Sequence, residues 1–470
     1  VTGRRREVKG EVEYTLNSAK TYLNSRTKVY ADWNASSGVM NLDGNATDLQ
    51  VRPWKRSLSE DLSLSHTAPD GHILKLFSST GYTGLPGQLL TLDGKQETLD
   101  IGMFSSRNYA SVQHRTGKWL LGGKAGFDAR RQQINGHSWS MLMPYLEPSF
   151  QRESGPHTLD GALRVSWQRR EYDGNSLQGV YLEPTLRWNW KLTPTSSFFA
   201  LYRCSVSPVA GIRVVDEPVY TSYRSRYAGT GKPDVQASHF LTGSYTYRNP
   251  VNGIFFSASP SYTRSIGNHL YASTIDSGIL LQQATGQVYD ADSWVMDGRL
   301  SKSFSWCRTV IGFSGSALRS DYSYLSAGKV VDARTVGYTA SVDYSFRPAR
   351  WMTVEGGSLL EMTRRSVEGT ATAGVNDWEH RMQLNFLPAK RWMISLHNEL
   401  YHSSERDFGV NWFCDASLSY KADRWELSLS GRNLMGTTQY ERVHISSAEQ
   451  SYTLTYLRPR EVVVRFCLDL

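Results

Sequence analysis

Three polar side chains near residue 66 have the residue types of a hydrolytic triad. Ser65 and His66 are adjacent, and Asp70 follows four residues later. They flank the turn 68–71, and a Ser-His-Asp triad depends on three-dimensional geometry rather than on closeness in sequence. The chain contains no HExxH, GxSxG, phosphate-binding or dinucleotide-binding motif. We therefore expect no catalytic residues and no enzyme activity.

Metal and redox chemistry have little support in the sequence. Asp43, Asn45 and Asp48 offer oxygen ligands of the kind that calcium prefers, but a polar surface loop explains them more simply. The four cysteines are far apart and have neither CxxC nor His-rich spacing, which argues against a disulfide framework and a zinc site. They are Cys204, Cys307, Cys414 and Cys467. No cofactor is indicated, and the only metal candidate is the weak calcium group.

Aromatic and cationic side chains gather in two polar connections. The first holds Tyr220, Tyr223, Arg224, Arg226 and Tyr227, and the second holds Tyr271 and Tyr289. Aromatic rings stack on sugars or flat chelates, and arginine pairs with carboxylates or phosphates. Each of these residues taken singly is more simply explained as a solvated loop residue. Together they are the best candidates for ligand binding.

The elements that would position these residues show a strict two-residue alternation. In 182–192 the even positions are apolar or aromatic and the odd positions are polar or charged. The segments 119–127 and 336–346 alternate in the same way. Since successive side chains of a strand point in opposite directions, each segment predicts a strand with one apolar and one polar face.

Average hydropathy alone would place this chain among soluble proteins. The mean hydropathy is -0.44 over 470 residues, and no apolar run approaches the roughly 18 residues that a membrane helix needs. A membrane strand, however, shows apolar residues only at every second position, so its average stays polar. The net charge of +8 is spread along the chain without a basic block, which argues against nucleic-acid binding.

Strand length favours a membrane barrel over a soluble β-protein. Strands of sandwiches usually have about 5 to 6 residues, whereas membrane strands need about 9 to 11. Here the alternation persists for about ten residues or more in many segments. We predict an all-β fold, a large antiparallel transmembrane β-barrel formed by residues 1–470.

The expected turns fall into two classes. Longer polar connections are expected at 209–237, 266–293 and 435–451. Short turn signals occur at 18–25, 68–71, 116–117, 154–157, 193–196, 249–253, 306–308, 347–350, 387–390 and 421–424. Short turns at one end and long loops at the other are typical of outer-membrane barrels, with the short turns in the periplasm.

Tryptophans recur at the short turns. Such a recurrence predicts an aromatic girdle at the periplasmic side of the membrane. Its members are Trp119, Trp306, Trp351, Trp392 and Trp425.

The turn count predicts the number of strands. Ten short turns imply about twenty strands, and the last segment, 460–470, adds one more, giving about 21. Because single-chain bacterial barrels have an even number, we expect one further strand upstream of Val1, for 22. No signal peptide opens the chain, since the basic start is followed by charged residues rather than an apolar core. We expect an N-terminally truncated protein.

The last two strands carry a family resemblance. The segment 425–436, with Gly431-Arg432-Asn433-Leu434, and the closing strand 461–470 resemble the C-terminal end of TonB-dependent outer-membrane receptors, more narrowly those of Bacteroidota. The segment 181–208 also resembles their barrel. Two features depart from the family: Leu470 stands where an aromatic residue is usual, and neither a plug domain nor a TonB box is present.

The resemblance implies a location, partners and an activity. It implies the outer membrane of a Gram-negative bacterium, contact with outer-membrane lipid, and an upstream plug domain that binds the TonB complex. It allows a surface lipoprotein as a further partner. The implied activity is active import of a scarce solute such as a siderophore, glycan, peptide or cofactor. A passive porin or export barrel, and a soluble β-propeller binding module, are the alternatives.

Overall fold

The computed structural model describes residues 2–42, 45–90, 96–222, 225–276, 279–326, 328–404, 410–445 and 450–468. Most of these residues lie in β-strands. The helical segments in these ranges are two single 3-10 turns, η1 (Gly211–Arg213) and η2 (Ser305–Cys307). None of the described helices is long and apolar enough to cross a membrane.

Long strands account for most of the chain. The first ten are β1 (Thr2–Asn17), β2 (Thr21–Leu42), β3 (Asn45–Thr67), β4 (Ile73–Leu90), β5 (Gln96–Thr116), β6 (Trp119–Ile134), β7 (His137–Ser154), β8 (His157–Tyr172), β9 (Asn175–Thr193) and β10 (Ser196–Val209). The remainder are β13 (Asp234–Asn249), β14 (Ile254–Asp276), β15 (Ile279–Phe304), β16 (Thr309–Ser326), β17 (Lys329–Ala349), β18 (Met352–Val367), β19 (Thr370–Ala389), β20 (Trp392–Ser403), β21 (Asn411–Lys421), β22 (Trp425–Arg432) and β25 (Glu461–Leu468). Four short strands lie in the connections: β11 (Val219–Ser222), β12 (Ser225–Ala228), β23 (Gln439–Ile445) and β24 (Gln450–Tyr456).

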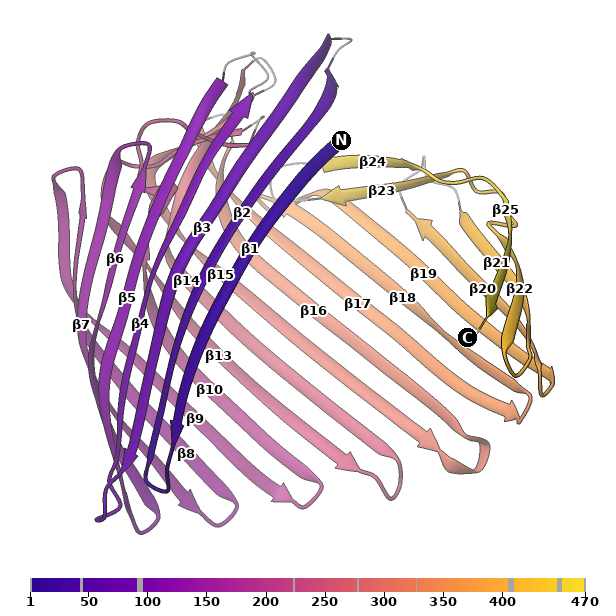
Figure 1. Cartoon of the computed structure of the whole chain (residues 1–470), viewed down its shortest axis with the longest axis horizontal. Helices are drawn as coiled ribbons and strands as arrows, with labels where there is room; N and C mark the ends of the chain where they lie inside the picture. The colour runs from indigo at the N-terminus through magenta and orange to yellow at the C-terminus, as the bar shows by residue number, and fades with distance from the viewer. Residues whose placement is uncertain are drawn as a thin grey trace.

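The long strands form one continuous meander. Each pairs antiparallel with the next, β10 continues to β13, and β22 continues to β25. Figure 1 shows this sheet curling around a central space. The meander has twenty-one strands in the described ranges, as the turn count predicts. The fold-class prediction is confirmed, and the propeller alternative is wrong because neighbouring strands join one sheet rather than separate blades.

The two outermost strands of the meander run in the same direction. Every neighbouring pair is antiparallel, so the first and last of an odd number of strands must be parallel. Within the described residues, β1 pairs only with β2, and β25 only with β22. These two edges therefore cannot close the sheet by antiparallel pairing.

All ten predicted short turns lie at one end of the sheet, the lower end in Figure 1. We call this the short-turn end and the opposite one the outer end. Proline, glycine, asparagine and aspartate supply the turn conformations there, as in Asn249-Pro250-Val251-Asn252-Gly253, where the Asn249 side chain accepts hydrogen bonds from two backbone N–H groups. The turn predictions are confirmed.

The outer end, where we predicted long loops, also holds short turns. Asn135-Gly136, Asp173-Gly174 and Glu368-Gly369 form two-residue turns in which both residues have positive φ. Such turns match the twist of the paired strands, and Asn-Gly and Asp-Gly are their usual sequences. The connection 266–293 is mostly strand, because β14 and β15 extend as a long hairpin, whereas 209–237 is a long connection as predicted.

Candidate functional site

The two faces of the sheet differ in chemistry. On β9, Val180, Leu182 and Leu186 are 66%, 57% and 47% exposed. Glu183 and Arg187 alternate with them and point to the opposite face. A wide apolar surface on the outside of a curled sheet suits contact with lipid, and the polar inner face lines the central space, called the lumen below.

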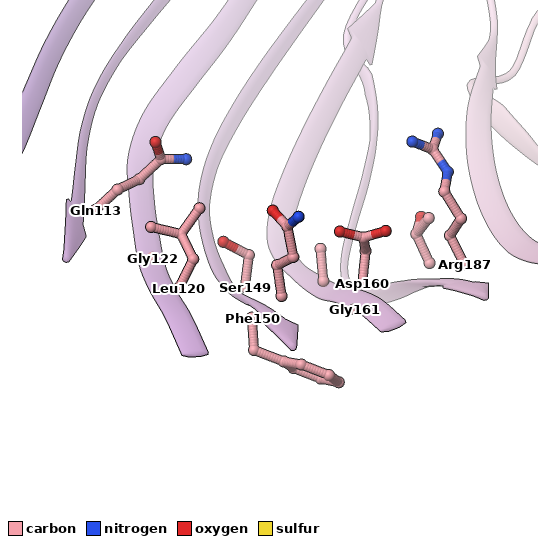
Figure 2. A pocket seen from close by; sticks show the side chains of 11 residues that line it. Gln113, Leu120, Gly122, Ser149, Phe150, Asp160, Gly161 and Arg187 are labelled. Carbon is pink, nitrogen blue, oxygen red and sulfur yellow. The ribbon is translucent and has the colours of Figure 1, made fainter. Parts of the chain in front are cut away.

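A hollow of about 260 Å³ lies in the wall near the short-turn end (Figure 2). Gln113, Asp160 and Arg187 point to the same side of the sheet, and Phe150 points away from them. The Phe150 ring packs where Gly161 has no side chain, since a Cβ there would lie 2.4 Å from the ring. The hollow thus offers an amide, a carboxylate and a guanidinium as hydrogen-bonding groups on the lumenal face.

Ion pairs cross the lumenal wall between neighbouring strands. The Glu147 carboxylate accepts hydrogen bonds from Lys124 at 2.7 Å and from Arg164 at 2.8 Å. Nearer the outer end, Arg107 lies 3.5 Å from the buried carboxylate of Asp128. The interior is therefore polar but largely charge-paired at these positions.

A second hollow, of about 560 Å³, lies beside Arg107 and Asp128 over strands β3 to β6. Hydroxyl groups and one further arginine dominate its polar lining. These residues are Ser57, Ser59, Ser79, Ser105, Thr83 and Arg130. Such a lining can hydrogen-bond polar solutes, and its arginines favour anionic ones.

The described parts of the connection between β10 and β13, residues 210–222 and 225–233, fold against the lumenal wall, and we call them the inner loop. Val214 and Val215 are buried against Trp139 and Met141 of β7 and Tyr172 of β8. Fully burying an aliphatic side chain contributes about 1.5 to 3 kcal/mol, so this contact fixes the loop. Farther along the loop, β12 pairs in parallel with β15, so the loop bridges two parts of the rim.

Polar contacts fasten the inner loop to the outer ends of β7 and β8. His137 Nδ1 lies 2.7 Å from an oxygen of Asp173 in the turn after β8, and its Nε2 lies 3.3 Å from Glu217 in the loop. The Tyr172 hydroxyl donates to the Asp216 carboxylate at 3.0 Å. We call these five residues the rim clamp.

The carboxylates favour the charged form of the imidazole. The hydrogen bond to Asp173, with a smaller contribution from Glu217, raises the pKa of His137 above its ordinary value of 6.5. The same hydrogen bond lowers the pKa of Asp173. The clamp is therefore an ion pair whose strength depends on pH.

The structure gathers some of the predicted ligand-binding tyrosines at the outer end. The rings of Tyr227 on β12 and Tyr271 on β14 lie 5.2 Å apart. Burial raises the pKa of the Tyr227 phenol, and hydrogen bonding to Tyr271 adds to the shift. Burial likewise raises the pKa of Tyr289 on β15, with a further contribution from Tyr271. These three tyrosines form one aromatic cluster.

The other predicted ligand residues are distributed differently. Tyr220 and Arg226 face each other across the β11–β12 hairpin, with the guanidinium 4.2 Å from the ring centroid and hydrogen-bonded to the hydroxyl. They are engaged with each other in this conformation. Tyr223 and Arg224 lie outside the described residues.

Comparison with solved structures gives the fold. A mutant of the ferric enterobactin receptor from Pseudomonas aeruginosa, in complex with enterobactin, aligns over 93% of this chain and 65% of its own, with 11% identity and a TM-score of 0.54. A second structure of that receptor aligns with 11% identity and a TM-score of 0.51, again over 93% of this chain and 65% of its own. The chain has the fold of the β-barrel of that receptor.

The receptor fold rests on these two alignments. The siderophore receptor PirA, also from Pseudomonas aeruginosa, aligns over 99% of this chain and 80% of its own, with 9% identity and a TM-score of 0.42. No model of a known protein family matches the sequence. No curated protein matches it either. The chain spans about two thirds of the length of the ferric enterobactin receptor, 65%.

The predicted turn residues Ser65, His66 and Asp70 do not contact one another as a catalytic triad would. His66 bonds through Nδ1 to the hydroxyl of Thr21 at 2.8 Å, and Asp70 accepts from the backbone of His72, so Ser65, His66 and Asp70 form no triad. Neighbouring strand residues such as Ser65 and His66 point to opposite faces.

The calcium candidates fall mostly outside what the structure describes. Asp43 lies outside the described residues, and Asn45 and Asp48 belong to β3 without described side chains. Among the described residues, no group of three or more His, Cys, Asp or Glu side chains could hold a metal. The four cysteines are free thiols.

The five girdle tryptophans all lie exposed at or beside short turns. Trp392 contacts Tyr420 at 4.9 Å between ring centroids, Tyr420 contacts Trp425 at 5.2 Å, and Trp425 contacts Phe466 at 6.1 Å. An aromatic row thus follows the short-turn end across four strands. Its role at a membrane interface stays a prediction.

Sequence reasoning missed three functional candidates. His137 stands beside an Asn-Gly turn, and Val214-Val215 is an apolar pair inside a polar connection, which is a signal for an inward-folding loop. Arg170 lies on the lumenal face of β8, and nothing in its sequence neighbourhood indicates its complete burial.

Proposed function

We propose that this chain forms the barrel of a TonB-dependent outer-membrane receptor that actively imports a scarce solute. The fold shared with the ferric enterobactin receptor supports this function most directly. The apolar outer face and the polar lumen are consistent with it, because lipid surrounds such a barrel and solute passes through it.

The proposal includes the partners of such a receptor. A plug domain in the lumen would gate the barrel and would contact the TonB complex, and the polar hollow shown in Figure 2 offers it hydrogen-bonding groups. Outer-membrane lipid would contact the apolar face. A surface lipoprotein is a further partner if the receptor is of the Bacteroidota type.

Solute capture would take place at the outer end. The cluster of Tyr227, Tyr271 and Tyr289, together with the Tyr220–Arg226 pair, presents aromatic faces and one guanidinium there. The ferric enterobactin receptor was solved with enterobactin, so siderophores are one solute class, beside glycans, peptides and cofactors.

A growth experiment tests the function. Cells lacking the gene are complemented with the wild-type gene and grown on single scarce solutes, each in a strain with and without the TonB complex. Import by a TonB-dependent receptor predicts that complementation restores growth on at least one solute and that loss of TonB abolishes it.

The same experiment separates the passive alternative. A porin would support growth equally in both strains, because diffusion needs no energised partner. Unchanged growth after loss of TonB on every solute that the gene supports would contradict active import.

A further inference from the structure

Arg170 is a lumenal arginine that is completely buried. Its exposed fraction is 0%, and its guanidinium carbon lies 5.1 Å from the ring centroid of Tyr181. Nη1 donates to the Tyr181 hydroxyl at 3.3 Å, and Nη2 donates to the side-chain oxygen of Gln168. These contacts hold the planar guanidinium in one orientation, yet Nε has no hydrogen-bond partner.

This buried cation also has no anionic partner. Across the part of the chain that the structure describes, no carboxylate oxygen lies within 4.0 Å of Arg170, whereas lumenal Arg164 pairs with Glu147 at 2.8 Å and keeps 30% of its side chain exposed. Removing a charge from water without a counter-charge is strongly unfavourable. A buried, unpaired cation of this kind is a candidate for a functional site, because a ligand could supply the missing charge.

The inner loop lies over this part of the wall. Met141 pairs with Arg170 across the β7–β8 ladder, and Tyr172 follows Arg170 on the same face of β8. Both belong to the apolar cluster that Val214 and Val215 of the loop complete. The loop therefore packs on the residues next to Arg170. A ligand would reach the guanidinium when the loop moves away from this part of the wall.

The neighbouring wall carries further positive charge. Arg130 pairs with Met141 on the next strand, so it continues the lumenal row that contains Arg170. Arg130 and Arg107 also line the serine-rich hollow, where Asp128 is the lining carboxylate. In this hollow Asp128 pairs with Arg107, which leaves Arg130 as the excess positive charge of the lining.

We propose that Arg170 anchors an anionic oxygen group of the transported solute, a carboxylate or a phosphate, in a lumenal site roofed by the inner loop. The guanidinium fork suits both groups because it offers parallel N–H donors to two oxygens. This assignment rests on the proposed import function and deepens it by naming the charge of the solute.

Isothermal titration of the purified full chain in detergent tests the site, with inorganic phosphate in one arm and citrate in the other. The variants are Arg170→Met, Arg170→Lys and, as matched control, Arg299→Met, which removes an arginine that alternates with the exposed Met296 and Leu300 of β15 and so faces the lumen far from β8. Glu217→Gln is included in both arms because it weakens the rim clamp and so makes the inner loop easier to displace.

The wild-type chain should bind at least one of the two anions saturably, and the tighter of them identifies the group. Arg170→Met should weaken that binding at least about tenfold, Arg170→Lys should weaken it less, and Arg299→Met should leave it unchanged. Glu217→Gln should tighten binding, since it raises the population of the open loop conformation that can bind the anion. Absence of saturable binding in both the wild type and Glu217→Gln, or equal binding in Arg170→Met, would overturn the site.

Thermal unfolding separates a binding role from a structural one. If Arg170 is kept for a ligand, Arg170→Met should leave the midpoint unchanged or raise it, because an unpaired buried charge is removed. A lowered midpoint with unchanged anion binding would identify Arg170 as a structural residue instead. The two proposals fail separately. Absence of anion binding would refute the anion site and leave the import proposal standing, because anion binding needs no energy source. TonB-independent growth would refute active import and leave the anion site standing.

Discussion

His137 Nε2 lies 3.3 Å from the carboxylate of Glu217, and this contact joins strand β7 to the inner loop. The other ring nitrogen contacts Asp173, so the imidazole sits between two carboxylates. The charge of His137 therefore contributes to how firmly the loop is attached at the rim, beside the packing of Val214 and Val215. The lumenal wall beneath the loop includes Arg170, so attachment of the loop and access to that residue are linked.

The rim clamp should weaken as pH rises. The raised pKa of His137 means that its contribution is complete below 6.5 and is lost as pH rises through the raised value. The lowered pKa of Asp173 means that its contribution is complete above 3.8 and is lost at more acid pH. The protection factors of the amides of residues 211–222, which compare their exchange with the intrinsic rate at the same pH, should therefore be highest between these values and lower at pH 9.

The substitution Glu217→Gln should reproduce part of that loosening at pH 6. Because the Glu217 side chain is 75% exposed, we expect a loss of only about 0.2 to 1 kcal/mol in the opening free energy of the loop. Glu171→Gln is the control, since Glu171 pairs with Arg169 and not with the loop. Equal exchange in the wild type and Glu217→Gln at pH 6 would show that the contact does not hold the loop.

A charged residue on the outward face of β9 should lower the unfolding free energy of the barrel in lipid. Trp188 stacks on Trp190 at 5.6 Å between ring centroids, on the face that carries the exposed apolar residues. We expect Trp188→Arg to destabilise the folded barrel in lipid by about 2 to 4 kcal/mol if the site is near the bilayer midplane. Asn189→Arg places the same charge on the lumenal face and should cost much less. Equal unfolding free energies for both variants would contradict the assignment of faces.

Replacing Gly126 by alanine should destabilise the barrel, whereas the same change at Gly123 should not. A Cβ at Gly126 would lie 2.4 Å from the backbone oxygen of Asn108, whereas a Cβ at Gly123 would meet nothing within 4 Å. Gly126→Ala should therefore cost about 1 to 3 kcal/mol of unfolding free energy, because the β5 and β6 backbones must move apart. Gly123→Ala should be neutral or slightly stabilising. Urea unfolding in lipid vesicles measures both, and the same cost at both glycines would refute the close approach.

The strands were predictable because the alternation and the turn residues that mark each strand lie within its own stretch of sequence. The alternation in 182–192 depends only on which face of β9 meets water. Asn249-Pro250 likewise marks the turn between β13 and β14 without help from distant residues. Local patterns of this kind do not depend on how the sheet curls, so the strand count and the short-turn end followed from them.

The site was less predictable because its contacts join distant segments. Tyr227 meets Tyr271 only because β12 pairs with β15, and the pairing of a short strand inside a loop has no sequence signal. The apolar cluster beside Arg170 is completed by Val214 and Val215, which lie in a loop that begins forty residues after Arg170. The long-loop prediction for 266–293 failed because polar residues in that segment extend β14 and β15 rather than leave the sheet.

The most direct test of the central claim, an inside-out barrel with a lipid-facing exterior and a wet lumen, is a cysteine scan along β9 in outer-membrane vesicles. The four native cysteines are replaced by serine, and single cysteines at positions 180 to 187 are labelled with a fluorophore and quenched by nitroxide lipids. Strong quenching should alternate with period two, high at Val180, Leu182 and Leu186 and low at Glu183 and Arg187. Quenching without that alternation, or strongest at Glu183 and Arg187, would contradict the claim.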